Sequence, residues 1–306
     1  MERYRSWMFV PGHIGKMVDK ALGLPADVIM LDIEDGVLPA SKPLARETIA
    51  AALGRPSQGP YRFVRINAIG HPDARADLEA AVQPGCDGIV APKVETVDDI
   101  RRLEALIAEF ERRRKIVSPL RIVAAIESAA GLLGAAGIAK ASSRVCGMML
   151  GAEDLARDIG LPIRREAEAH ELLYARSALV IAAAAANVQS IDQVWPDIKD
   201  VDGLRRDAAQ ARRLGLSGKA LIHPGQIGPV NEAFSPTPDD LEFARSVVEA
   251  FREAESRGLG SVAFGGQLLD KPIVERARAT LAMGEKLRLA ARERSKTAGR
   301  ADNADR

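Results

Sequence analysis

The 306-residue sequence has little of what marks several common classes of protein. Its two cysteines, Cys86 and Cys146, lack the spacing of metal ligands, and so low a count suits a reducing cytoplasm. The 43 Lys and Arg residues and 42 Asp and Glu residues leave a net charge of +1, so charge gives no reason to expect nucleic-acid or membrane binding. The first apolar run, Trp7–Val10, is too short for a signal peptide, and no run is long enough to span a membrane. We therefore expect a cytoplasmic protein.

Two further features are missing. The chain has no G-x-S-x-G sequence, the strand-to-helix turn on which many hydrolases carry a nucleophilic serine. It has no low-complexity linker, and no internal repeat beyond an alternation of strand-like and helix-like segments. The sequence therefore gives no reason to expect a serine nucleophile or a string of repeated domains.

What the chain does contain is a regular alternation of apolar runs and helical patterns. Eight short apolar runs predict buried strands: Trp7–Val10, Val28–Ile33, Tyr61–Ile66, Gly88–Ala91, Ile122–Ile126, Val145–Leu150, Val188–Ile191 and Ala220–Ile222. Helical patterns lie between them: Gly15–Leu22, Lys42–Leu53, Ala74–Val82, Val97–Arg114, Ala129–Ala139, Ala167–Ala186 and Leu204–Leu214. Eight β-α units predict an α/β fold in which residues 1–230 form a catalytic (β/α)₈ TIM barrel.

Residues 231–290 exceed what the barrel needs, and we expect them to form a C-terminal helical lid or oligomerisation extension. A Pro-broken loop, Phe234–Pro238, precedes a predicted helix from about Asp239 to Gly258. A Gly-rich turn at Gly260–Gly266 then leads to a last helix from Pro272. Residues 291–306 are polar, and we expect a disordered tail there.

Acidic residues follow two neighbouring predicted strands. Glu127 comes directly after the fifth run, and Asp154 comes shortly after the sixth. The carboxyl ends of parallel strands meet at one face, so the two carboxylates should lie side by side. No His or Cys is close by in sequence, and an all-oxygen site favours Mg²⁺ first and Mn²⁺ second over zinc. The alternative is that both residues only cap helix N-termini.

Polar residues also follow the other strands, as expected of a barrel that carries an active site at this face. They include Pro11-Gly12-His13, Asp32, Glu34, Asp35, Asn67, Asp192, Asp197 and Asp200. Arg65 interrupts an apolar strand, so it either holds a substrate carboxylate or thioester oxygen or forms a buried ion pair with Asp32 or Glu34. Lys93 has the chemistry of a Schiff-base lysine, but a salt bridge or substrate contact explains it better. His223, before a proline, fits a structural hydrogen-bonding role.

Nine stretches of the chain, taken together, carry a resemblance to a known family. They are RSWMFVPG (5–12), ADVIMLDIEDGV (26–37), KPLAR (42–46), VRIN (64–67), APKVE (91–95), AIESAAGL (125–132), GAEDLARDIG (151–160), GKALIHPGQI (218–227) and QLLDKP (267–272). In this order they resemble the citrate lyase β-subunit family, HpcH/HpaI aldolase/citrate lyase, which includes malyl-CoA and citramalyl-CoA lyases. The resemblance covers nearly the whole chain and implies a (β/α)₈ barrel with Mg²⁺-dependent lyase chemistry.

The resemblance also implies roles for individual residues at the barrel face. Glu127 and Asp154 fall on the family's metal ligands. Arg65 falls on its substrate arginine, and Glu34 and Asp35 fall on an acidic pair near the metal-bound waters. The resemblance thus implies the same two metal ligands that the strand ends suggest.

Other positions concern coenzyme A and the C-terminal extension. Asp270 falls on the acid/base of a lid that in relatives reaches a neighbouring subunit's site. Phe9 and Lys20 fall where relatives contact coenzyme A. Several acyl-CoA lyases have an arginine at the position of Ile14, where it meets the CoA phosphates. Here either Lys16 substitutes for it or the thioester carrier differs.

The sequence therefore predicts a lyase that cleaves or forms 3-hydroxyacyl thioesters such as malyl-, citramalyl- or citryl-CoA, giving a 2-oxo acid and an acyl thioester. One alternative is a citrate lyase β-type subunit that acts on citryl-acyl-carrier protein within a complex, and another is a metal-dependent 2-oxo-acid aldolase. The resemblance implies a homo-oligomer, either a trimer or a hexamer built from trimers. It leaves coenzyme A and an acyl carrier protein open as the thioester carrier.

Overall fold

The computed structural model describes residues 3–56, 59–163 and 169–304. The chain forms two compact units, Met1–Phe234 and Ser235–Arg306. None of the described helices is both long enough and apolar enough to cross a membrane.

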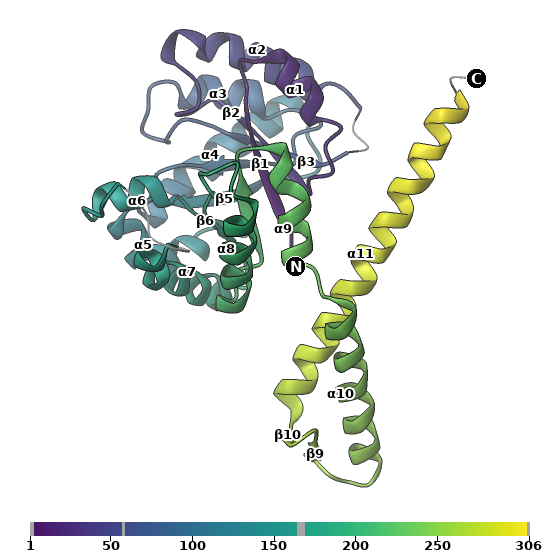
Figure 1. Ribbon diagram of the computed structural model, residues 1–306. Helices are drawn as coiled ribbons and strands as arrows, with labels where there is room; N and C mark the ends of the chain where they lie inside the picture. The colour runs from purple at the N-terminus through teal and green to yellow at the C-terminus, as the bar shows by residue number, and fades with distance from the viewer. Residues whose placement is uncertain (1–2, 57–58, 164–168, 305–306) are drawn as a thin grey trace. The chain divides into compact units, whose positions relative to one another are not determined.

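The first unit is a closed barrel of eight parallel strands in sequence order, surrounded by helices (Figure 1). The strands are β1 Ser6–Pro11, β2 Val28–Asp32, β3 Tyr61–Arg65, β4 Gly88–Ala91, β5 Arg121–Ile126, β6 Val145–Leu150, β7 Gln189–Asp192 and β8 Gly218–Leu221. The barrel closes where Ser6 of β1 pairs with Lys219 of β8. Each predicted apolar run forms one strand, with its bounds shifted by at most two residues, so the (β/α)₈ barrel is confirmed.

The helices of this unit largely follow the predicted pattern. They are α1 Gly15–Ala21, α2 Lys42–Leu53, α3 Ala74–Ala81, α4 Val97–Arg114, α5 Ala129–Ala139, α6 Ala152–Asp158, α7 Leu173–Ala186, α8 Val201–Leu214 and α9 Ile227–Ala233. The capping alternative already implies a helix at Asp154, which is α6, although the sequence gives no bounds for it. The sequence misses α9, whose seven residues include Gly228 and Pro229, both unfavourable in helices. The helix expected from Ala167 begins at Leu173 after a 3₁₀ turn, His170–Leu172, while residues 167 and 168 lie outside the described part of the chain.

Side chains on each strand alternate between two cores. Trp7, Met30, Phe63, Met149 and Ile191 belong to a cluster inside the barrel. Their neighbours along the strands belong to a larger cluster between barrel and helices. Because side chains alternate with a period of two, residues two positions beyond an inward residue also point inward, toward the mouth of the barrel.

The second unit contains two helices and a short hairpin. These are α10 Pro238–Ser256, β9 Val262–Phe264, β10 Gln267–Leu269 and α11 Lys271–Ala304. Val247 and Phe251 of α10 pack with Leu269 and Val274 in a core of the unit's own. The sequence predicts only a Gly-rich turn where the antiparallel pair β9–β10 forms, because strands of three residues show no clear alternation.

The last helix also differs from the expectation for the tail. The backbone of residues 291–304 continues α11, where the sequence predicts a disordered segment. Ala, Arg, Glu and Lys make up much of this stretch, and these residues are favourable in helices.

Candidate active site at the mouth of the barrel

Glu127 and Asp154 meet at the carboxyl ends of β5 and β6. Both line a cavity of about 120 Å³, together with Phe9 and Arg65. Glu127 directly follows β5, which ends at Ile126. Asp154 lies in the first turn of α6, and Gly151 is the single residue between β6 and this helix. The structure thus brings together four residues that the sequence assigns to the site.

Neither carboxylate acts as a helix cap. Helix α5 is capped by Ser128, whose hydroxyl accepts a hydrogen bond from the backbone N–H of Gly131. Helix α6 has no side-chain cap hydrogen bond. Glu127 instead accepts from the backbone N–H of Lys93 at 3.0 Å, and Asp154 pairs with Arg157 at 2.8 Å. Neither Glu127 nor Asp154 therefore caps a helix through a side-chain hydrogen bond, and the capping alternative is wrong in this respect.

The electrostatic surroundings of Glu127 oppose its ionisation. The residue is 8% exposed, and burial is the largest reason why its pKa rises to about 7, with Glu34 and Asp154 raising it further by repulsion. Arg65 and the Lys93 N–H act in the opposite direction. A carboxylate under this repulsion gains stability from any added positive charge nearby.

Arg65 is held rigidly across the cavity wall. Its Nε and Nη2 donate to the two oxygens of Asp32 at 2.7 and 2.8 Å, and its Nη1 lies 3.3 Å from Glu34. The guanidinium also stacks over the ring of Phe9, 4.6 Å from its centroid. These partners keep the pKa of Arg65 above its usual value despite burial. The buried ion pair expected as one alternative exists, and the same side chain lines the cavity.

Lys93 joins the acidic pair of β2 to the site. Its ammonium lies 2.5 Å from Glu34 and 2.9 Å from Asp35. Although burial opposes it, these two carboxylates raise the pKa of Lys93 above its usual value. A Schiff-base lysine must lose its proton, so the salt bridge is the better description of this residue.

The charges around the cavity leave a surplus of carboxylates. Asp32, Glu34, Asp35, Glu127 and Asp154 face three cations, Arg65, Lys93 and Arg157. The described residues contain no group of three or more His, Cys, Asp or Glu side chains that could enclose a metal. Two carboxylates with open positions suit Mg²⁺, which keeps several of its waters.

Gly151 allows Glu127 to sit where it does. A Cβ built on Gly151 would lie 2.3 Å from Cγ and 2.6 Å from Oε1 of Glu127. Sequence reasoning misses this glycine, although its place between a strand and a short acidic helix is a signal that could have found it. Gly151 thus leaves room for the carboxylate of Glu127 beside α6. The carboxylate oxygens of Glu127 and Asp154, with their surplus of negative charge, fit a hard cation.

The remaining predicted residues fall into two groups. Lys16 and Lys20 are exposed on α1, and within the described part of the chain neither forms a hydrogen bond or ion pair with a residue of the cavity. Asp270 begins the second unit's last helix and is exposed, with its Oδ1 accepting from the N–H of Ile273 at 3.4 Å. The helix-start role considered for Asp270 is present, and its catalytic role stays a prediction.

Two other strand-end residues are structural. His223 accepts through Nδ1 from the N–H of Gly225, which agrees with the hydrogen-bonding role expected for it. Asp192 does not reach the cavity. It lies in a fully buried cluster with Lys219, Arg176 and Asp207, between the barrel and helices α7 and α8.

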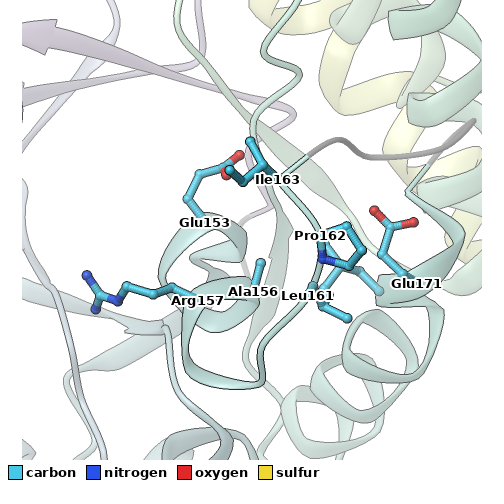
Figure 2. A pocket seen from close by; sticks show the side chains of 8 residues that line it. Glu153, Ala156, Arg157, Leu161, Pro162, Ile163 and Glu171 are labelled. Carbon is cyan, nitrogen blue, oxygen red and sulfur yellow. The ribbon is translucent and has the colours of Figure 1, made fainter.

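A second cavity lies beside α6. It measures about 350 Å³ and is lined by Glu153, Ala156, Arg157, Leu161, Pro162, Ile163, Glu171 and Leu172 (Figure 2). Glu153 lines both this cavity and the one that contains Glu127 and Asp154. The approach to the barrel mouth is therefore bordered on this side by an acidic residue and a short apolar loop.

Comparison with known proteins agrees with this geometry. The family model HpcH/HpaI aldolase/citrate lyase matches residues 5–224. The chain is 39% identical to citrate lyase subunit beta of Leuconostoc mesenteroides subsp. cremoris over 90% of this chain and 91% of that protein. It is 35% identical to the (3S)-malyl-CoA thioesterase of Cereibacter sphaeroides over 92% and 95% of the two chains.

A solved structure gives the same picture. The CitE protein of Mycobacterium tuberculosis, in complex with magnesium, acetoacetate and coenzyme A, matches with a TM-score of 0.76 and 33% identity, over 92% of this chain and 98% of that one. The barrel, the matched family model and these relatives together identify the chain as a lyase that belongs to the HpcH/HpaI aldolase/citrate lyase family.

Proposed function

We propose that this protein is a Mg²⁺-dependent carbon–carbon lyase that cleaves or forms 3-hydroxyacyl thioesters such as malyl-, citramalyl- or citryl-CoA. The observation that carries the proposal is the pairing of Glu127 and Asp154 beside Arg65 in one cavity. The CitE protein of M. tuberculosis, solved in complex with magnesium, acetoacetate and coenzyme A, supports the same chemistry. The products are a 2-oxo acid and an acyl thioester.

Glu127 and Asp154 would hold the metal ion. When bound, Mg²⁺ would supply Lewis acidity to the hydroxyl and carboxylate oxygens of the substrate. Mn²⁺ would serve as a substitute, because it accepts the same oxygen ligands. Glu127 and Asp154 would place the ion, and with it the substrate oxygens, in the cavity that Arg65 also lines.

Arg65 stabilises the charge that forms when the C2–C3 bond breaks. The bond's electron pair moves to the thioester as an enolate, and the carbinol carbon becomes the carbonyl of the 2-oxo acid. Asp32 fixes the guanidinium before the reaction begins, so its remaining N–H groups face the enolate oxygen without reorganisation. The hydroxyl proton leaves to water held by the acidic pair Glu34 and Asp35.

The enolate carbon then needs a proton. Asp35 is a poor donor of this proton. Burial raises its pKa, but the hydrogen bond and the charge of Lys93 lower it, and the pKa of Asp35 lies below its usual value. Asp270 forms no such ion pair within the described part of the chain, and it is exposed at the start of α11. We assign the proton transfer to Asp270, because it falls on the acid/base position of the family's lid, with water held by Glu34 or Asp35 as the alternative route.

The substrate test uses the purified chain alone. Malyl-, citramalyl-, methylmalyl- and citryl-CoA are supplied with Mg²⁺, and the 2-oxo acid and the acyl thioester are measured separately. Cleavage of one of these, lost in Glu127→Gln and Asp154→Asn with the barrel still folded, is the expected result. Activity that survives both changes without added metal contradicts the metal assignment.

A second candidate is a β-type subunit that acts on a thioester of an acyl carrier protein. The similarity to citrate lyase subunit beta of L. mesenteroides favours it. So does Ile14, at the position where the family resemblance implies an arginine in several acyl-CoA lyases. Failure to cleave any free acyl-CoA, with cleavage restored by an acyl carrier protein thioester, would select this candidate.

Assembly belongs to the same proposal. We expect a homotrimer, or a hexamer built from two trimers, in which Asp270 serves a neighbouring barrel. Mixing Asp270→Asn chains with Glu127→Gln chains should restore activity, because some sites then combine an intact metal pair with an intact Asp270. A mixture that stays inactive while subunits demonstrably exchange would assign Asp270 to its own barrel or to its helix alone.

A further inference from the structure

Lys93 has an unusual backbone conformation for its residue type. Its φ is +53°, and among the described residues only three other non-glycine residues have a positive φ. Residues other than glycine and asparagine are disfavoured at a positive φ, in general by roughly 1–3 kcal/mol of conformational free energy. The conformation turns the backbone N–H toward Glu127 while the side chain reaches back to the end of β2.

One residue therefore contacts both acidic groups of the site. The N–H lies 3.0 Å from Oε2 of Glu127, on the metal-ligand side. The ammonium lies 2.5 Å from Oε1 of Glu34 and 2.9 Å from Oδ2 of Asp35. Arg65 contacts the other oxygen of Glu34, so Oε1 is the oxygen that Lys93 occupies.

The surplus of carboxylates raises a question of metal choice. Lys93 contacts both Glu34 and Glu127, and Glu34 repels the charge of Glu127. Without the ammonium, Oε1 of Glu34 would therefore become a ready ligand for a cation at Glu127. Ca²⁺ takes six to eight oxygen ligands in flexible geometry, whereas Mg²⁺ binds through few carboxylates and keeps its waters. More available carboxylate oxygens would therefore favour Ca²⁺ over Mg²⁺.

We propose that the Lys93 ammonium sets the metal specificity of this site by withholding Glu34 and Asp35 from coordination. Glu127 and Asp154 then remain as the assigned ligands, with Glu153 as a further carboxylate in the cavity lining, and a site with so few carboxylates suits Mg²⁺. Lys93 is in this role a positioning residue that acts through its neighbours. The inference rests on the proposed metal site and adds how that site rejects a larger cation.

The test compares Mg²⁺ and Ca²⁺ affinities by calorimetry, without substrate. Lys93→Gly removes the ammonium yet suits the positive φ, so the N–H that holds Glu127 stays in place. We expect Ca²⁺ to bind about tenfold tighter or more, from the lost charge and the freed oxygens, and the preference for Mg²⁺ over Ca²⁺ to fall about tenfold. Lys93→Arg keeps the charge and should keep the preference.

Two further variants complete the design. Lys93→Gln is a neutral variant of similar length, and it must shift the preference in the same direction as Lys93→Gly. Lys115→Gly is the matched control, since Lys115 has a φ of +56° at the end of α4 that is remote from the site. It should leave both affinities unchanged.

The outcomes separate the two proposals. Loss of Mg²⁺ binding in Glu127→Gln would show that the native chain binds the ion through Glu127. If that holds and neither neutral variant at position 93 changes the ratio of Ca²⁺ to Mg²⁺ affinity, the role of Lys93 is refuted. If Glu127→Gln binds Mg²⁺ as well as the native chain does, the metal site itself is refuted, and the inference with it.

Discussion

Gly151→Ala tests the site with a single methyl group. The added Cβ would lie 2.3 Å from Cγ of Glu127 and 2.6 Å from its Oε1, so the side chain of Glu127 must move. The φ of Gly151 is −91°, which alanine adopts readily, so the backbone adds little strain of its own. Moving Glu127 also breaks its hydrogen bond to the Lys93 N–H, which at a charged acceptor is worth about 1.5–3 kcal/mol.

The displacement should appear in both binding and rate. A shift of about 1 Å in a group that positions substrate costs roughly 10²-fold in rate, and we expect that loss in kcat/KM with a weaker Mg²⁺ affinity by calorimetry. Gly228→Ala is the control, because a Cβ there meets nothing within 4 Å. In a Glu127→Gln background the alanine should change Mg²⁺ affinity little further. Native affinity and rate in Gly151→Ala would refute the placement of Glu127.

Three further outcomes are expected. Arg65→Lys keeps the charge but loses the planar fork that Asp32 holds, so kcat/KM should fall about 10²-fold, and a near-native rate would leave only the structural ion pair. The pKa of Glu127 is raised to about 7, so protons compete with the metal. Mg²⁺ affinity measured by calorimetry should therefore fall as pH drops from 8 to 6, and an affinity that stays constant over this range would contradict the assignment. Asp207→Asn leaves buried cations uncompensated and should lower the free energy of unfolding by about 3–5 kcal/mol, measured by urea denaturation, without changing the Mg²⁺ affinity of the folded protein.

The pH dependence also has a consequence for stability. Between pH 4.5 and 7 the unfolded chain has lost the proton of Glu127 while the folded chain keeps it, so the unfolded state binds fewer protons. The contribution of this group to the free energy of unfolding therefore falls as pH rises through that window. Saturating Mg²⁺ should oppose the loss, since binding to the folded state alone stabilises it.

Much of the barrel follows from local sequence. Apolar runs of three to six residues that alternate with helical patterns predict buried parallel strands, and eight such units favour a closed barrel. The positions of Glu127 and Asp154 at one face follow from that topology before any coordinate is known. The sequence does not show, however, that Glu127 leaves its helix uncapped. Ser128 can cap the same helix end, and only the folded backbone decides between the two residues.

Other features depend on contacts between distant segments. The partners of Lys93, Glu34 just after β2 and Glu127 just after β5, lie more than thirty positions away in either direction along the chain. The hairpin β9–β10 is specified by packing of Leu269 against α10 rather than by its own short strands. Local propensity carries no information about either.

Two acidic clusters of this barrel use the same kinds of residue in opposite ways, and strand alternation explains the difference. Ile191 points into the barrel, so Asp192 points outward, where Lys219, Arg176 and Asp207 complete a cluster with two carboxylates and two cations. That cluster is fully buried and balanced, so it needs no ligand. Phe63 points inward, so Arg65 does too, and the carboxylates around it outnumber the cations. A surplus of negative charge at a cavity distinguishes a cation site from a structural ion cluster. In this chain, the alternation of side chains along a strand places Arg65 at the cation site and Asp192 in the ion cluster.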